Sequence, residues 1–146
     1  MFNLAEISIN YTPQFKLSNL PLIGSSSDAE VIFRQGWTNS ICYKEEFVIM
    51  LLNRANRVLG LSKISTGGLA GTIADPKVIF QTALKANASA IILCHNHPSG
   101  NLKPSRADLS LTEKLKNAGK FLDIQIYDHI ILTSESYYSF ADEGLL

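Results

Sequence analysis

The stretch HNHPSGNLKPSRAD, residues 95–108, is the part of the chain from which the fold and the site can be worked out. It follows an apolar run at residues 89–94, whose small and branched side chains predict a buried strand. Residues i and i+2 of a strand point to the same face, about 7 Å apart along the backbone. His95 and His97 therefore project together, at a spacing that lets two imidazoles converge on one metal ion.

The residues after the histidines predict a turn and then a helix. Pro98, Gly100 and Pro104 favour the turn, and Ser105 is placed to begin the helix. Asp108 then lies in the first helical turn, where its carboxylate can come back toward the histidines. Two imidazoles, one carboxylate and an open fourth position are the usual surroundings of a catalytic zinc ion. Ser105-x-x-Asp108 is also a capping box that needs no chemistry, but its combination with the histidine pair favours the metal site.

The bulk composition predicts one globular domain over residues 1–146. Of the 146 residues, 46% are hydrophobic and 18% are charged, which is typical of a soluble domain with a real core. The formal net charge is zero, and no cluster of lysines and arginines stands out. Nucleic-acid-binding domains usually carry a basic excess, so this balance weighs against direct binding of nucleic acid.

Cysteine content and the N-terminus predict a cytoplasmic protein. Cys42 and Cys94 are too few for a disulfide framework, and both lie in apolar stretches, so buried thiols are expected. The N-terminus lacks the basic and apolar regions of a signal peptide, and no uncharged run is long enough to span a bilayer. We therefore expect no membrane partner.

The hydrophobic pattern alternates between strands and helices. Strands are predicted at residues 4–11, 46–52, 58–65, 89–94 and 121–133. Helices are predicted after a Ser27/Glu30 capping box, after the Asp-Pro pair at residues 75–76, and from Ser105 to Gly119. This alternation predicts the α/β class, with a mixed β-sheet flanked by helices. The apolar N-terminal strand could pair with a second copy, which leaves a homo-oligomer open.

A zinc ion held as above lowers the pKa of a bound water to about 7, so that the water can attack a carbonyl. The reaction also needs a nearby base and a donor for the developing oxyanion. Glu45 and Glu46 stand at the start of a predicted strand, and only one of them can face inward. Both faces of that strand are apolar, so periodicity leaves the choice open. Ser105 is placed to donate to the oxyanion, and the glycine-bearing loop at residues 66–72 is either a connection or a rim of the cleft.

These motifs resemble a known family. The pattern His95-x-His97, seven residues, Ser105, two residues and Asp108 matches the metal motif of the JAB/MPN (JAMM) metalloproteases without a gap. The longer run of residues 95–108 is similar to the RadC branch. Further similarities are Glu45-x-Phe47, Asp128-His129-Ile130 and Ser139-Phe140-Ala141-x-x-Gly144. The resemblance covers roughly residues 40–146.

The resemblance implies a JAB/MPN fold, similar to that of the cytidine deaminases, and a zinc-dependent hydrolase of peptide or isopeptide bonds. It implies one Zn²⁺ per chain, bound by His95, His97 and Asp108. It assigns the general base to Glu45 and the stabilisation of the tetrahedral intermediate to Ser105. The substrate would be a peptide or protein of unknown identity. Residues 1–40 are too short and too strand-like for the helix-hairpin-helix region that precedes this domain in RadC proteins, so no such domain is expected.

Alternatives stay open for the ligands and for the function. His129 could replace Asp108 in a three-histidine site, although a core or supporting role for His129 is favoured. Cys94 stands where the family pattern has a small residue, and its thiolate could be an adventitious ligand. A zinc deaminase is excluded because the chain lacks both H-x-E and P-C-x-x-C. The alternative function is a non-catalytic binding module associated with DNA repair or recombination.

Overall fold

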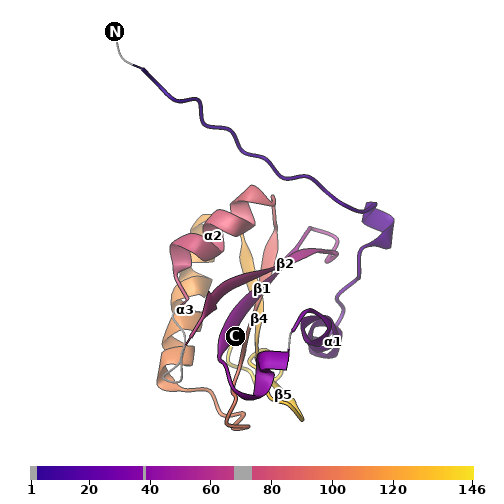
Figure 1. Cartoon of the computed structure of the whole chain (residues 1–146), viewed down its shortest axis with the longest axis vertical. Helices are drawn as coiled ribbons and strands as arrows, with labels where there is room; N and C mark the ends of the chain where they lie inside the picture. Colours follow the sequence, from indigo (N-terminus) through magenta and orange to yellow (C-terminus); the bar gives the residue numbers. More distant parts are fainter. Residues whose placement is uncertain (1–2, 38, 68–73) are drawn as a thin grey trace.

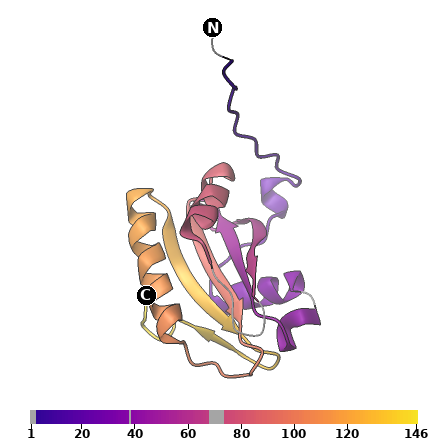
Figure 2. The same ribbon diagram turned by 60° about the vertical axis from the view of Figure 1, so that its left-hand side comes forward.

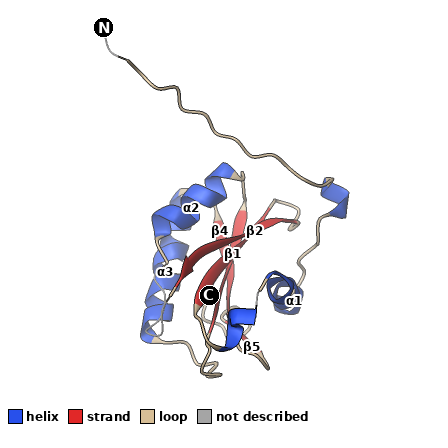
Figure 3. Cartoon of the chain, in the orientation of Figure 1, coloured by secondary structure: helices blue, strands red, loops and turns tan. Residues whose placement is uncertain are grey.

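The computed structural model describes residues 3–37, 39–67 and 74–146. In these ranges, five strands form one mixed sheet and three α-helices pack on it, as Figure 3 shows, which confirms the predicted α/β class. The elements are α1 (Ser26–Gly36), β1 (Glu46–Leu52), β2 (Val58–Thr66), α2 (Pro76–Lys85), β3 (Ala90–Asn96), α3 (Arg106–Phe121), β4 (Gln125–Leu132) and β5 (Tyr137–Ser139), with short 3-10 helices at Leu17–Asn19 and Asn39–Cys42. None of the helices in the described ranges is long and apolar enough to cross a membrane.

The sheet has the strand order β2-β1-β3-β4-β5. Neighbouring strands are antiparallel except β3 and β4, which are parallel. A parallel pair needs a crossover connection, and α3 supplies it. In the antiparallel pair of β1 and β3, Phe47 lies opposite His95. This register brings the start of β1 beside the end of β3.

Strand alternation divides the core into two layers, because successive side chains of a strand point to opposite faces. Helices α2 and α3 cover one face of the sheet, and α1 lies on the other (Figures 1 and 2). Phe47, Ile49 and Leu93 pack on the side of α2 and α3. Met50 and Cys94 pack on the side of α1. Odd-numbered residues of β1 and β3 therefore face α2 and α3, and even-numbered residues face α1.

The boundaries of the central elements differ from the predicted ones by a few residues. Strand β1 begins and ends as predicted, whereas β3 continues to Asn96, so that His95 lies inside the strand. Gly119 does not end α3, which continues to Phe121. A Cβ atom at Gly119 would lie 2.2 Å from the carbonyl oxygen of Ile124, so the returning chain leaves no room for a side chain there. The predicted strand start at residue 121 is also wrong, because this residue still belongs to α3 and β4 begins at Gln125.

The strand predicted at residues 4–11 is wrong. These residues are extended but carry no ladder, and they run away from the body of the molecule (Figure 1). The side chains of Ile7 and Ile9 are 91% and 79% exposed. Alternation gives a strand only where a neighbouring strand takes up the backbone hydrogen bonds, and no other described segment does so here.

The N-terminal cap of α1 is also corrected. Ser25, not Ser27, is the N-cap, and its side chain accepts the backbone N–H of Asp28 at 3.2 Å. The carboxylate of Asp28 in turn accepts the N–H of Gly24 at 2.9 Å. These two hydrogen bonds fix the start of α1 at Ser26, two residues before the predicted helix start. Glu30 therefore takes no part in a capping box.

The two cysteines lie in different surroundings. Cys94 is fully buried on the α1 face of β3, and burial raises the pKa of its thiol well above the ordinary value. Cys42 is exposed, so the prediction of two buried thiols is wrong for that residue. Cys42 ends a short 3-10 helix at the surface, where a local apolar neighbourhood in the sequence gives no burial.

Candidate metal centre

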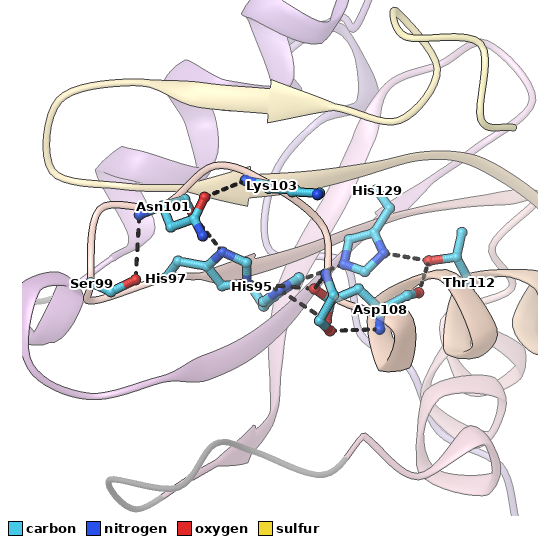
Figure 4. A network of polar contacts seen from close by, with 9 residues as sticks. His95, His97, Ser99, Asn101, Lys103, Asp108, Thr112 and His129 are labelled. Carbon is cyan, nitrogen blue, oxygen red and sulfur yellow. Dashed lines mark hydrogen bonds and ion pairs between the residues drawn. The ribbon is translucent and has the colours of Figure 1, made fainter.

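The side chains of His95, His97 and Asp108 meet between the end of β3 and the first turn of α3 (Figure 4). The Nε2 atoms of the two histidines are 2.9 Å apart. Asp108 Oδ1 lies 3.3 Å from His95 Nε2, and Asp108 Oδ2 lies 3.5 Å from His97 Nε2. The structure therefore brings together the three side chains that the sequence singles out as candidate metal ligands.

Asp108 caps the helix and reaches the histidines at the same time. Ser105 Oγ accepts the N–H of Asp108 at 3.0 Å, and Asp108 Oδ2 accepts the N–H of Ser105 at 2.7 Å, which confirms the predicted capping box. Asp108 Oδ1 takes no part in the box and faces His95. The two interpretations of Ser105-x-x-Asp108 are thus compatible, because the cap holds the carboxylate in the orientation that brings it to the imidazoles.

The proton on His97 can be placed from its hydrogen-bond partner. His97 Nδ1 lies 2.6 Å from the backbone carbonyl oxygen of Asn101. A carbonyl oxygen only accepts, so Nδ1 must carry the proton. In the neutral imidazole, Nε2 of His97 then presents a lone pair toward His95 and Asp108.

The proton on His95 follows from a chain of three contacts. Thr112 Oγ1 donates to the backbone carbonyl of Asp108 at 2.7 Å, which uses its one proton, so it accepts from His129 Nδ1 at 2.6 Å. Burial lowers the pKa of His129 well below its ordinary value and keeps the ring neutral. Its Nε2 therefore carries a lone pair and accepts from His95 Nδ1 at 2.8 Å. In the neutral tautomer with the proton on Nδ1, His95 Nε2 presents a lone pair as well.

The cluster is thus electron-rich, since both Nε2 atoms and the carboxylate of Asp108 are acceptors. Zinc–ligand bonds of about 2.0–2.1 Å place the ligand atoms of a tetrahedral site about 3.3 Å apart. The observed separations of 2.9, 3.3 and 3.5 Å are close to this value. The three residues fit a small divalent cation in both spacing and protonation.

Charge within the cluster moves two pKa values in opposite directions. Burial alone would raise the pKa of Asp108, but the imidazoles of His95 and His97 beside it outweigh burial and hold that pKa well below the ordinary range. The contact with Asp108 raises the pKa of His97, against the effect of burial. The carboxylate is therefore ionised wherever the protein is folded near neutral pH.

Glu45, the residue directly before β1, also lies near the cluster. One oxygen of its carboxylate lies with the ring nitrogens of His95 and His97 in a group whose members are within 4.8 Å of one another. Asp108 makes the shorter contacts with the same nitrogens. The histidine pair therefore has one carboxylate at ligand distance and a second one farther out.

The pairing of β1 with β3 shows which of Glu45 and Glu46 lies on the face of the histidines. Phe47 lies opposite His95, so the odd-numbered residues of β1 share the face of His95. Glu46 points to the α1 face, where its carboxylate pairs with Ser40 and Lys63. Glu46 is thus buried in a neutralised pair and turned away from the cluster.

The remaining sequence-derived candidates are distributed around this cluster. Ser105 Oγ accepts one hydrogen bond and keeps its proton for a further acceptor. His129 does not take the place of Asp108 beside the two Nε2 atoms, because its own Nε2 faces Nδ1 of His95. Cys94 lies on the opposite face of β3. Of the loop at residues 66–72, Gly67 donates to the carbonyl of Glu45 at 2.8 Å, and residues 68–72 lie outside the described residues.

Three contributors were not singled out from the sequence. Thr112 and Asn101 fix the protons of the histidines, and Asn96 holds the backbone around Glu45. Thr112 lies four residues after Asp108, on the same face of α3, and this spacing is a signal that could have identified it. Asn101 acts through its backbone carbonyl, for which the residue type carries no signal.

The chain is similar in sequence to several curated proteins. A UPF0758 protein of Flavobacterium johnsoniae is 50% identical over 101 residues, covering 69% of this chain and 44% of that protein. A UPF0758 protein of Rubrobacter xylanophilus is 36% identical over 126 residues, covering 86% of this chain and 54% of that protein. A third, from Porphyromonas gingivalis, is 42% identical over 104 residues, covering 70% and 46%. The chain spans about half the length of these curated relatives.

The mixed sheet, with two histidines at the end of a central strand and an aspartate in the next helix, defines an α/β domain with a candidate metal centre. The chain belongs to the family of RadC-like JAB domains, whose model matches residues 23–145. The predicted family is thereby confirmed. The names of the relatives specify no reaction, so the chemistry must be argued from the site itself.

Proposed function

We propose that this domain is a zinc-dependent hydrolase of peptide or isopeptide bonds, with the zinc ion held by His95, His97 and Asp108. The observation that carries the proposal is the convergence of two imidazole nitrogens and one carboxylate, with separations of 2.9, 3.3 and 3.5 Å. Zinc at this point would supply an activated water and a Lewis acid for a substrate carbonyl. The membership of the RadC-like JAB family supports the assignment.

Glu45 is the general base in this proposal. Its carboxylate lies beyond the ligand distance of Asp108 but within reach of a water placed beside the histidines. It would accept the proton from the attacking water and deliver it to the nitrogen of the scissile amide, so that the amine leaves neutral. The carboxylate is then regenerated without a second titratable group.

Ser105 stabilises the oxyanion in the same scheme. Its hydroxyl accepts from the helix backbone and has its own proton available, so it can donate to the carbonyl oxygen as negative charge develops. The N-terminus of α3, at which Ser105 stands, adds a favourable dipole for that charge. The substrate would be an amide-bonded peptide or protein.

The test compares Glu45→Gln with Glu46→Gln, two neighbouring isosteric changes on opposite faces of β1. Zinc-loaded wild type and variants are incubated with peptide and isopeptide libraries, and the products are identified by mass spectrometry. Glu45→Gln should keep its zinc and lose turnover by about 100- to 10,000-fold, whereas Glu46→Gln should keep both.

Normal turnover of Glu45→Gln would contradict the assignment of the base. A zinc-loaded wild type that leaves every amide intact would contradict the hydrolase, and would favour the non-catalytic binding module instead.

A further inference from the structure

We propose that Asn96, the residue between the two histidines, is a positioning residue that holds the backbone of Glu45 at the metal centre. The proposal rests on the role of Glu45 as the base. Asn96 is the last residue of β3 and is fully buried. Because it alternates with His95 and His97, its side chain points to the α1 face, away from the cluster.

The amide of Asn96 makes three hydrogen bonds to the segment that leads into β1. Its Nδ2 donates to the backbone carbonyls of Ile41 and Lys44, each at 2.8 Å. Its Oδ1 accepts the backbone N–H of Glu46, also at 2.8 Å. A side-chain amide has two donor protons and one acceptor oxygen, so this buried group is satisfied by the segment alone.

Two of these bonds bracket the proposed base. Lys44 precedes Glu45, and Glu46 follows it, so the backbone is tied to β3 immediately before and immediately after the base. The ladder between β1 and β3 ends at the pair of Phe47 and His95. The side chain of Asn96 thus continues the connection one residue beyond the point where backbone pairing stops.

This arrangement couples the base to the ligands through one short piece of strand. His95 and His97 supply the imidazoles on one face, and Asn96 bonds from the other face to the backbone on both sides of Glu45. Gly67 adds a third restraint, since its N–H donates to the carbonyl of Glu45 at 2.8 Å. A misplacement of a catalytic group by about 1 Å can cost about 100-fold in rate. The hydrogen bonds from Asn96 and Gly67 to the backbone around Glu45 therefore act on the position of the proposed base as well as on stability.

The test replaces Asn96 with Leu, which is similar in size and makes no hydrogen bonds, and with Ser as a milder second change. Asn53→Ala is the matched control. Asn53 also bonds two backbone N–H groups, those of Ala55 and Arg57 at 2.9 and 3.0 Å, but in the turn at the other end of β1. Hydrogen exchange of single amides, zinc affinity and, for a cleaved substrate, kcat and KM are measured on the whole chain.

In the Asn96 variants, the amide of Glu46 should exchange at least about tenfold faster, while the amide of Met50 in the middle of β1 keeps its protection. Zinc affinity should change by less than about threefold, and kcat should fall by about 100-fold at constant KM. Asn53→Ala should leave exchange at Glu46, zinc affinity and kcat unchanged.

Faster exchange throughout β1 and β3 would overturn the proposal, because Asn96 would then serve global stability. Loss of zinc in step with the faster exchange would also overturn it, since the residue would be holding the ligands. If wild type binds zinc but cleaves nothing, the hydrolase fails, and the exchange and zinc measurements still decide whether Asn96 positions Glu45.

Discussion

The two faces of the sheet where β1 begins and β3 ends both carry buried or partly buried polar groups, but the contacts of these groups differ. On the α1 face, Glu46 pairs with Lys63, and the amide of Asn96 pairs with three backbone groups. On the other face, His95, His97 and Asp108 turn acceptors toward one another.

The difference separates a polar network that is satisfied by its own contacts from a cluster that fits a cation. Buried polar groups normally find partners, because an unpaired one costs about 1–3 kcal/mol. On the α1 face, the polar groups of Glu46 and Asn96 are paired with protein groups, so they need no further ligand. A group of converging acceptors has no such pairing unless a cation joins it. The predictions below test this contrast, beginning with the largest effect.

The first prediction concerns the metal ligands. Wild type should bind about one zinc per chain, and Asp108→Ala should lose most or all of it, because the third donor is removed. Metal content after dialysis measures the effect. Ser105→Ala is the control, since it removes the side chain of the N-cap and keeps the carboxylate of Asp108. Equal zinc loss in both variants would mean that Asp108 matters only through the helix cap.

The second prediction concerns the residue that sets the histidine protons. Thr112→Val removes the acceptor for His129 Nδ1, which frees His129 and hence His95 to take the wrong tautomer. Supporting partners of this kind are worth about 10- to 100-fold in metal affinity, and we expect a weakening of that size in a competition titration.

Thr82→Val is the matched control for this change. Thr82 makes the same bond to the carbonyl four residues before it, on the exposed face of α2, with no histidine attached. Its variant should bind zinc like wild type, and Thr112→Ser should restore most of the affinity. Full affinity in Thr112→Val would show that the tautomer of His95 does not depend on this chain of bonds.

The contrast between the faces also explains what could be predicted from the sequence. The ligand triad could be predicted because its geometry is local: strand alternation places His95 beside His97, and a helix cap returns Asp108. The assignment of the base to one of two glutamates could not be made from periodicity. It depends on which residue of β1 lies opposite His95, and that register comes from pairing between distant segments.

The wrong predictions also concern features that depend on contacts between distant segments. Residues 4–11 alternate between apolar and polar side chains as a half-buried strand does, but the described chain offers them no neighbouring strand. The start of α1 lies in a run of three serines, each able to cap a helix. Ala29 and Phe33 are fully buried against the sheet, so tertiary packing sets the phase of the helix and selects Ser25. Local pattern identified the elements, and non-local packing decided their ends and partners.

The third prediction concerns the paired network on the α1 face. Burial alone would raise the pKa of Glu46, but bonds from Lys63 and Ser40 outweigh it and lower the pKa below its ordinary value. The ionised form therefore stabilises the fold, and this contribution is present above the pKa of the unfolded chain, about 4.3, and is lost as the pH falls through the folded pKa.

Glu46→Gln should consequently reduce the free energy of unfolding at pH 7 by about 1–3 kcal/mol, with the zinc content unchanged. The difference from wild type should shrink as the pH approaches about 3.5. Urea unfolding of wild type and variant at pH 7 and at about pH 3.5 measures the difference in the free energy of unfolding at each pH. A difference that is the same at both values would mean that the charge of Glu46 contributes nothing beyond its shape.

The smallest effect is expected for Cys94→Ala, which tests whether the α1 face can reach the metal at all. Cys94 precedes His95 directly, yet its thiol packs in the α1-side core with a pKa raised by burial, so it is a neutral side chain that faces away from the cluster. The variant should therefore keep its full zinc affinity. It should lose about 1 kcal/mol of stability, because a small cavity replaces the sulfur. A fall in zinc affinity without a fall in stability would mean that the thiolate is a ligand. In that event a residue of the α1 face would bind the metal. The contrast between the paired network on one face and the acceptor cluster on the other would then not hold.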